Sequence, residues 1–492
     1  MNRLIALAIA LLCVGCPVGP DYKAPDIHEP ESFRVDVPVE KGASLADLPW
    51  WKVFEDPELQ KLVNRAIREN LNLRAAAARV EQSRAFIGVA RSQLLPQVGY
   101  SGDFSRQRAP FRPGGQPQTY NLFTGAFNLA WEIDLWGRIR RSSEAAEAQF
   151  WAAEEAQRGI LLSLVSGVAE AYFQLLKLDR EKAIAEETVL AFQKSLDLFQ
   201  QRYEGGVGSE LAVARAEAAL ADVASLVPSL DAQIVVAENV LNVLLGQNPA
   251  EITRGKPLAD QKTVPEIPAG IPSELLQRRP DLKQAEDRMI SANASVGVSV
   301  ANFFPRIGLS SLYGSASTDL SDMLNGTPGV WNIAAALSGP IFTGGLNYRQ
   351  YQAQVAAWEV EVAVFEQAVL EAFAEVSNLL TIQYSLRAQR EERERSVRAL
   401  ENAVDLSFLR YEIGLANYFE VIDAQQELFP AQINLARTRT QQLTVIAQLS
   451  RALGGGWELQ TTEAWELPKP SPTPAVGTEA SPKPTPAAVI SD

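Results

Sequence analysis

Four stretches of this chain alternate apolar and polar residues, which is the pattern of β-strands with one apolar face. In NLFTGAFNLAWEIDL, which begins at Asn121, aromatic and aliphatic side chains take nearly every second position. Strands are predicted over about residues 97–106, 121–135, 306–315 and 330–342. Each is long enough to cross a bilayer as a tilted strand, which takes about 9–11 residues. The alternation alone fits either a soluble sandwich or an outer-membrane barrel.

Helical patterns without proline fill two much longer stretches, residues 138–203 and 346–411. At a rise of 1.5 Å per residue, about 66 residues span about 100 Å, so these helices exceed any ordinary globular domain. Such length predicts coiled-coil packing. A glycine-containing turn ends each long helix, and return helices are predicted over 210–245 and 419–453. Further helical patterns precede the strands, at Glu58–Leu95 and Ser273–Phe304.

The chain also repeats itself. NLRAAAARVEQSRAFIGVARSQLLPQVGYS aligns without a gap with DLKQAEDRMISANASVGVSVANFFPRIGLS at an offset of 209 residues. RYEGGVGS then aligns with RYEIGLAN at an offset of 208. Because the spacing is nearly constant, the sequence predicts two similar halves, residues 47–255 and 262–460.

The N-terminal stretch MNRLIALAIALLCVGC resembles a secretory signal, with a basic residue before an apolar run of about eleven residues. A small residue precedes Cys16, so we predict a lipoprotein signal peptide over residues 1–15 and lipidation of Cys16. A plain signal peptide, and a redox or metal role for the C-x-x-C pattern, are the alternatives. Residues 16–46 are then a lipid-anchored extended segment, and residues 465–492 form a proline-rich disordered tail.

Composition narrows the function further. The formal net charge is −14, and no basic face suited to nucleic acid is evident. One histidine, His28, lies in the proline-rich entry segment, which argues against a catalytic triad or a zinc site. We therefore predict no enzyme activity, no metal site and no cofactor. After the signal no uninterrupted apolar run approaches 18 residues, so any membrane crossing is expected to use β-strands.

Four strands cannot close a barrel by themselves, and an open edge in lipid leaves backbone groups without partners. Two chains would give eight strands, whose interior is filled by side chains, whereas three would give twelve. A conduit therefore favours a homotrimer with a shared twelve-stranded barrel.

Several phrases, spread in order over residues 15–457, carry a family resemblance. They are GCPVGPDYKAP, WWKVFEDPELQKLVNRAIRENLNL, EIDLWGRIRRSSEAA, RYEGGVGS, FFPRIGLS and RYEIGLANYFEVIDAQQELFPAQ. In these phrases the chain resembles the TolC-like outer-membrane efflux factors, in their NodT-type lipoprotein branch. That resemblance implies an α+β membrane protein: a trimeric twelve-stranded barrel in the outer membrane, on a periplasmic barrel of coiled-coil helices. The implied function is passive export through a tripartite pump, with a periplasmic adaptor and an inner-membrane pump as partners.

The resemblance also implies site residues. The two glycine turns would form the tips that meet the adaptor, with Gly206, Val207, Ser209, Gly414, Leu415 and Asn417. A periplasmic gate would pair an apolar ring of Phe419 with a ring of Asp423, one helical turn apart. Three close carboxylates would attract cations and make the closed pore cation-selective. Arg215 occupies the matching position of the first half, which leaves open a link to Asp423 from a neighbouring helix.

The cargo is less defined. The copper and silver branch of the family uses methionines, and this chain has three, so small organic compounds are the better expectation. A coiled-coil lipoprotein scaffold, a type I protein secretion duct and a secreted enzyme remain as alternative functions. The scaffold leaves the strands unexplained, and no catalytic constellation supports an enzyme.

Overall fold

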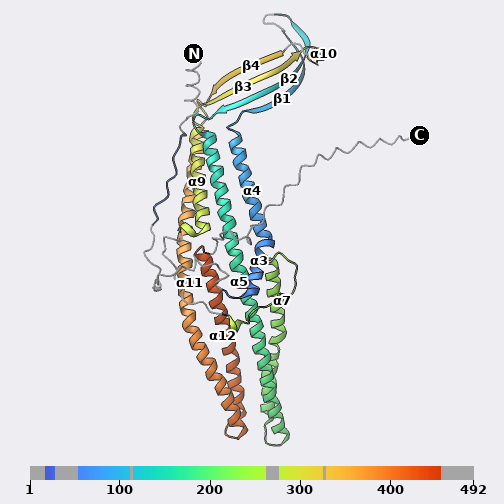
Figure 1. The fold of residues 1–492 in the computed structure, drawn as a ribbon, viewed down its shortest axis with the longest axis vertical. Coiled ribbons are helices and arrows are strands. Elements are labelled where there is room, and N and C mark those ends of the chain that lie inside the picture. Colours follow the sequence, from blue (N-terminus) through green and yellow to red (C-terminus); the bar gives the residue numbers. More distant parts are fainter. Residues whose placement is uncertain (1–16, 28–53, 111–114, 262–275, 325–328, 456–492) are drawn as a thin grey trace, which may run out of the picture.

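The computed structural model describes residues 17–27, 54–110, 115–261, 276–324 and 329–455. The predicted signal peptide, Cys16, His28 and the proline-rich tail lie outside the described residues. Strands gather at one end of the molecule, and two helical hairpins extend to the other end (Figure 1). The chain is thus elongated, with a sheet region and a helical region.

The sheet is antiparallel in the order β1-β2-β3-β4, with strands Gln97–Pro110, Pro117–Ile133, Arg306–Ser317 and Gly329–Ser338. Its register places Tyr100 opposite Phe127, Phe127 opposite Tyr313, and Tyr313 opposite Trp331. Residues directly opposite each other share a face, so one face carries an aromatic row across all four strands. The other face is mixed: small and polar residues predominate there, beside Leu122, Leu312 and Val330.

Strand ends differ from the predicted ones. β1 and β2 extend further toward their connecting loop than residues 106 and 121. β4 ends at Ser338, short of the predicted residue 342, just before Gly339 and Pro340. Proline has no N–H for a ladder hydrogen bond, which explains the early end.

Two long helices dominate the rest of the chain: α5, Arg138–Glu204, and α11, Leu346–Glu412, with 67 residues each. The return helices are α6, Glu210–Ala224, with α7, Leu226–Leu244, and the continuous α12, Tyr418–Ala452. The remaining helices are α3 (Pro57–Glu69), α4 (Leu71–Ser92), α9 (Pro280–Ala301), α10 (Leu320–Leu324) and the 3₁₀ turn η2 (Leu258–Asp260). α9 packs against the sheet-proximal halves of both α5 and α11, whereas α4 packs against α5 (Figure 1).

Two stretches expected to be single helices are broken. Asn70 separates α3 from α4, because its side chain accepts from the Leu73 N–H and donates to the Leu244 carbonyl, both at 2.9 Å. Ser225 separates α6 from α7, and Pro228 follows in the first turn of α7, where a missing N–H is tolerated. The first break is a side-chain cap that the apolar periodicity does not reveal, whereas Ser225 makes no side-chain cap hydrogen bond and the second break follows from Pro228.

Six of the eight glycines with positive φ in the described residues fall in pairs 208 residues apart. Gly137 and Gly345 precede the long helices, with φ of 76° and 88°, and Gly246 and Gly454 follow the return helices, with φ of 70° and 68°. Left-handed backbone favours glycine, so each pair marks the same turn in both halves. The duplication seen in the sequence is therefore present in the backbone.

Two helical stretches are as apolar in composition as membrane spans. Arg138–Glu204 and Glu210–Leu244 each contain an 18-residue window as apolar as a membrane span. Half of the α5 window is buried inside the chain, as in a helix packed within a bundle. Windows of this kind also occur in core helices, so they are weak evidence for a helical span, and the expectation that membrane crossing uses β-strands is not overturned.

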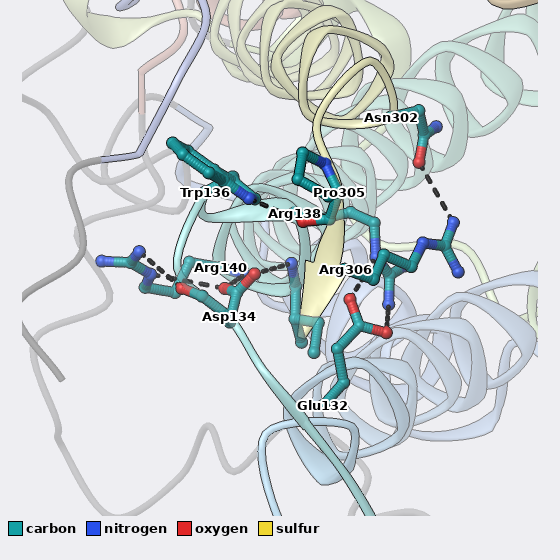
Figure 2. A network of polar contacts seen from close by, with 9 residues as sticks. Glu132, Asp134, Trp136, Arg138, Arg140, Asn302, Pro305 and Arg306 are labelled. Atoms are coloured by element: carbon teal, nitrogen blue, oxygen red, sulfur yellow. Dashed lines mark hydrogen bonds and ion pairs between the residues drawn. The ribbon is translucent and has the colours of Figure 1, made fainter. Parts of the chain in front are cut away.

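Sheet and helices meet at a polar junction (Figure 2). The Trp136 indole N–H donates to the Pro305 carbonyl at 2.7 Å. Arg138 makes two hydrogen bonds of 3.0 Å to Glu132. The Asp134 carboxylate accepts from the N–H groups at the start of α5, which the side-chain-free Gly137 cannot cap. These contacts fix the direction in which α5 leaves β2.

A buried carboxylate fixes the middle of the molecule. Asp56 is 0% exposed and caps α3 by accepting from the Glu58 N–H at 2.9 Å. It also accepts from the Tyr172 hydroxyl at 2.9 Å and the Gln261 amide at 2.7 Å. Burial, together with the nearby carboxylate, raises the pKa of Tyr172, so this hydroxyl remains a donor. Asp56 therefore ties α3 to α5 and to the segment after α7.

Asp56→Asn is expected to lower the free energy of unfolding by about 3 kcal/mol, because buried donors lose a charged acceptor. The midpoint of urea unfolding, followed by helical circular dichroism, measures the loss. Glu58→Gln is the matched control: among the described residues Glu58 forms an ion pair with exposed Lys61, and loss of this pair should cost at most about 0.5 kcal/mol. Equal stabilities of the two variants would contradict this role for Asp56.

Candidate gate and docking tips

Both long helices end in the same turn. At the end of α5 the Val207 N–H donates to the Arg202 carbonyl at 3.0 Å, and Gly206 has φ 75°. At the end of α11 the Leu415 N–H donates to the Arg410 carbonyl at 2.8 Å, and Gly414 has φ 79°. These are paired Schellman turns, in which only glycine takes the left-handed position without strain.

The predicted tip residues separate into two kinds. Val207 and Leu415 are 80% and 67% exposed, although both are apolar. Ser209 and Asn417 instead cap the return helices: Ser209 accepts from the Leu211 N–H at 3.2 Å, and Asn417 accepts from the Phe419 N–H at 2.9 Å. The turns therefore present Val207 and Leu415 outward, and their neighbours hold the turn in shape.

An aromatic cluster that the sequence analysis missed joins the two tips. The ring of Phe199 lies edge-on to Tyr411 at 5.2 Å between centroids and to Tyr418 at 6.0 Å. Arg202 lies over the Tyr411 ring at 4.3 Å and donates to the Glu412 carbonyl at 3.1 Å. Packing and a cation–π contact thus hold the two hairpins of one chain together.

The predicted gate residues lie just behind this cluster. Phe419 is 49% exposed, and Asp423, one turn further along α12, is also exposed. The Arg215 guanidinium carbon lies 6.0 Å from the centroid of the Phe419 ring. No ion pair joins Arg215 to Asp423 within the described part of this chain. Two of the three predicted gate residues are therefore brought together, and the link to Asp423 stays a prediction.

A buried polar contact beside the gate was also missed. The Ser195 hydroxyl on α5 donates to the Gln425 side-chain oxygen on α12 at 2.9 Å. Ser195 is 0% exposed and Gln425 is 4% exposed, so water does not compete for this bond. Glu217 and Ala403 occupy the equivalent repeat positions, and this asymmetry between the halves was the available sequence signal.

Among the residues that the structure describes, no group of three or more His, Cys, Asp or Glu side chains is arranged to hold a metal ion. Met289 is 1% exposed inside a core cluster with Leu282 and Phe365, so it lies away from the surface of this chain. The arrangement offers exposed apolar tips and an exposed Phe419 and Asp423 close behind them, rather than a reaction centre.

Comparison with known proteins decides the family. The model of the family described as outer membrane efflux protein matches residues 62–247 and 271–455. The chain belongs to this family. It is an outer membrane channel of an efflux pump, located in the outer membrane and extending into the periplasm, and it is not an enzyme.

Individual relatives agree over nearly the full length. The antibiotic efflux pump outer membrane protein ArpC of Pseudomonas putida is 34% identical over 480 residues, which cover 94% of this chain and 97% of ArpC. The cation efflux system protein CusC of Escherichia coli is 30% identical over 459 residues, which cover 93% of this chain and 99% of CusC. The outer-membrane channel OprN matches in structure with a TM-score of 0.83 at 30% identity, covering 90% of this chain and 100% of OprN. These matches confirm the predicted fold class: each chain has four strands, long helices and two repeats.

Proposed function

We propose that three copies of this efflux protein form one continuous duct across the outer membrane and periplasm. The observation that supports this most is the sheet: β1 and β4 are its two edges, and its aromatic face is exposed. Edges in lipid must be paired, and three chains close them into twelve strands around an open lumen. Helices of 67 residues then extend the duct by about 100 Å.

The partners in this proposal are a periplasmic adaptor at the hairpin tips and an inner-membrane pump behind it. Support comes from the exposed apolar Val207 and Leu415 at the ends of both hairpins. Names of relatives mention antibiotics, toluene and cations. With few methionines, one of them buried, this chain fits small organic compounds better than a methionine-based metal path.

Native mass spectrometry and planar-bilayer recording test the duct. The purified protein should have the mass of three chains and should conduct ions in discrete steps. A monomer without conductance would contradict the duct. A type I secretion duct is distinguished by export of an unfolded polypeptide, which the proposed pump would not support.

Cys16 belongs to the same proposal, as the site of lipidation. The described chain begins at Pro17, and the Val18 N–H donates to the Trp136 carbonyl at 3.1 Å. Asp21 then pairs with Arg141 at 2.6 Å. Because Pro17 and Val18 lie at the junction of sheet and helices, acyl chains on the preceding residue would enter the membrane beside the barrel.

Mass spectrometry of the mature N-terminus is expected to show an acylated Cys16. Cys16→Ala should lose the acyl mass yet still reach the outer membrane at reduced yield, because the barrel itself binds lipid. An unmodified N-terminus produced by cleavage at another position would contradict the lipoprotein proposal.

A further inference from the structure

The apolar face of the sheet ends in an unexpected pair of charges. Strand register assigns Val98, Tyr100 and Phe104 of β1 to the face that also carries the aromatic row. Arg106 and Arg108 follow on the same face, because side chains alternate along a strand. Among the described residues of the sheet, they are the only charged side chains on this face; Asp103, Glu132 and Arg306 lie on the other.

Their height relative to the membrane follows from the apolar band. On β2 this band runs from Ile133, next to the helices, to Phe123, ten residue steps away. Ten steps cover about 33 Å along a strand, or about 25 Å across the bilayer at the usual tilt, which matches a lipid-facing band. Arg106 lies two residues beyond Phe104, the partner of Phe123, so both arginines follow the band at its outer end.

Neither guanidinium has a partner within the described chain. Arg106 and Arg108 are exposed, and they lie opposite the neutral Asn121 and Thr119 on β2. Asp319 and Asp322, after β3, form no ion pair with either arginine among the described residues. Two cations without an ion-pair partner in the described chain therefore lie on a lipid-facing surface, although the net charge of the chain is −14. Anionic groups of the membrane itself would complement their charge.

The geometry points to Arg106 and Arg108 as a binding site for phosphate-bearing lipid headgroups of the outer leaflet. Guanidinium groups bind phosphate through two parallel N–H bonds, and the apolar band below takes the acyl chains of the same lipid. The two side chains are about 7 Å apart along the strand, so they can hold one phosphate between them or two phosphates separately. The site requires the outer-membrane location but not the gate or the adaptor.

The test compares two probes: diphosphorylated lipid A, and the same lipid with both phosphates removed. The purified trimer is incubated with each, and the lipid retained per chain is counted by native mass spectrometry. The wild-type protein should retain the phosphorylated lipid at least about fivefold better. Arg106→Gln with Arg108→Gln should abolish the preference, and Arg106→Lys with Arg108→Lys should keep part of it.

Arg74→Gln with Arg79→Gln is the matched control, because it removes two exposed arginines from the periplasmic helix α4 and should leave the preference intact. If the double Gln variant does not assemble, Arg106→Gln and Arg108→Gln are tested singly, and each should reduce the preference. Equal retention of both lipids by the wild-type protein, or an unchanged preference in folded Gln variants, would overturn the proposal. So would full displacement of the lipid by an equal concentration of inorganic phosphate, because it would indicate a site for free phosphate.

Discussion

Replacing Phe419 and Asp423 together by alanine is expected to raise the resting conductance of the channel about tenfold or more. Each chain would lose a contact between Arg215 and the Phe419 ring, worth about 0.5 kcal/mol at an exposed site. Three copies acting together change the balance of closed and open states by about 1.5 kcal/mol, which is about tenfold in population. Planar-bilayer recordings of purified trimers measure this change, and dye entry into cells reports it independently.

The matched control for the gate removes similar side chains from the other half. Leu211 occupies the repeat position equivalent to Phe419, so Leu211→Ala with Asp222→Ala should leave the resting conductance unchanged. Asp423→Asn alone should lower the cation selectivity, because the carboxylate ring supplies the attractive field. Wild-type conductance in the Phe419 and Asp423 variant, at normal trimer content, would place the gate elsewhere.

Tryptophan at both tips is expected to abolish export while the trimer and barrel stay intact. Val207→Trp with Leu415→Trp enlarges the two exposed apolar side chains at the ends of the hairpins. Disruption of an interface hot spot costs about 2 kcal/mol, so adaptor binding should weaken by at least about tenfold. Adaptor pull-down and the minimal inhibitory concentration of an exported compound measure the two effects.

Ser209 and Asn417 are less suitable probes of docking than Val207 and Leu415. Both cap helices, and loss of a cap costs about 1 kcal/mol, so their variants would mix folding with docking. Val98→Trp with Leu337→Trp makes the same two substitutions on the lipid-facing side of the sheet and should not affect export. Normal export by the Val207 and Leu415 variant would contradict docking at the tips.

The strands and long helices of this molecule could be predicted because both leave a periodic pattern of apolar residues in the sequence. Alternation identified all four strands, and the lack of proline marked the two long helices. The break at Asn70 could not be predicted in this way, since its side chain donates to the Leu244 carbonyl in a distant helix, whereas Pro228 is a sequence signal for the break at Ser225. The periodicity of apolar residues indicates which face of an element is buried. A helix cap instead depends on a single hydrogen bond between one donor and one acceptor, which leaves no periodic pattern.

The candidate gate was also predictable only in part. Phe419 and Asp423 could be proposed from spacing and family resemblance. The contact between Ser195 and Gln425 could not, because it joins two residues that lie 230 positions apart in the chain. The position of Phe199 against Tyr411 is equally non-local. Such pairs depend on how two hairpins approach each other, and neither hairpin's own sequence contains that geometry.

Equal length in the two long helices constrains how this protein can evolve. α5 and α11 have 67 residues each, and their turns share one hydrogen-bond pattern. Deleting one residue from α11 alone would shorten it by 1.5 Å and rotate everything beyond the deletion by about 100°. The face that packs against α12 and α9 would then point elsewhere. Inherited changes in length should therefore occur in both halves at once and in whole heptads of about 10 Å, so that the duct lengthens or shortens in steps.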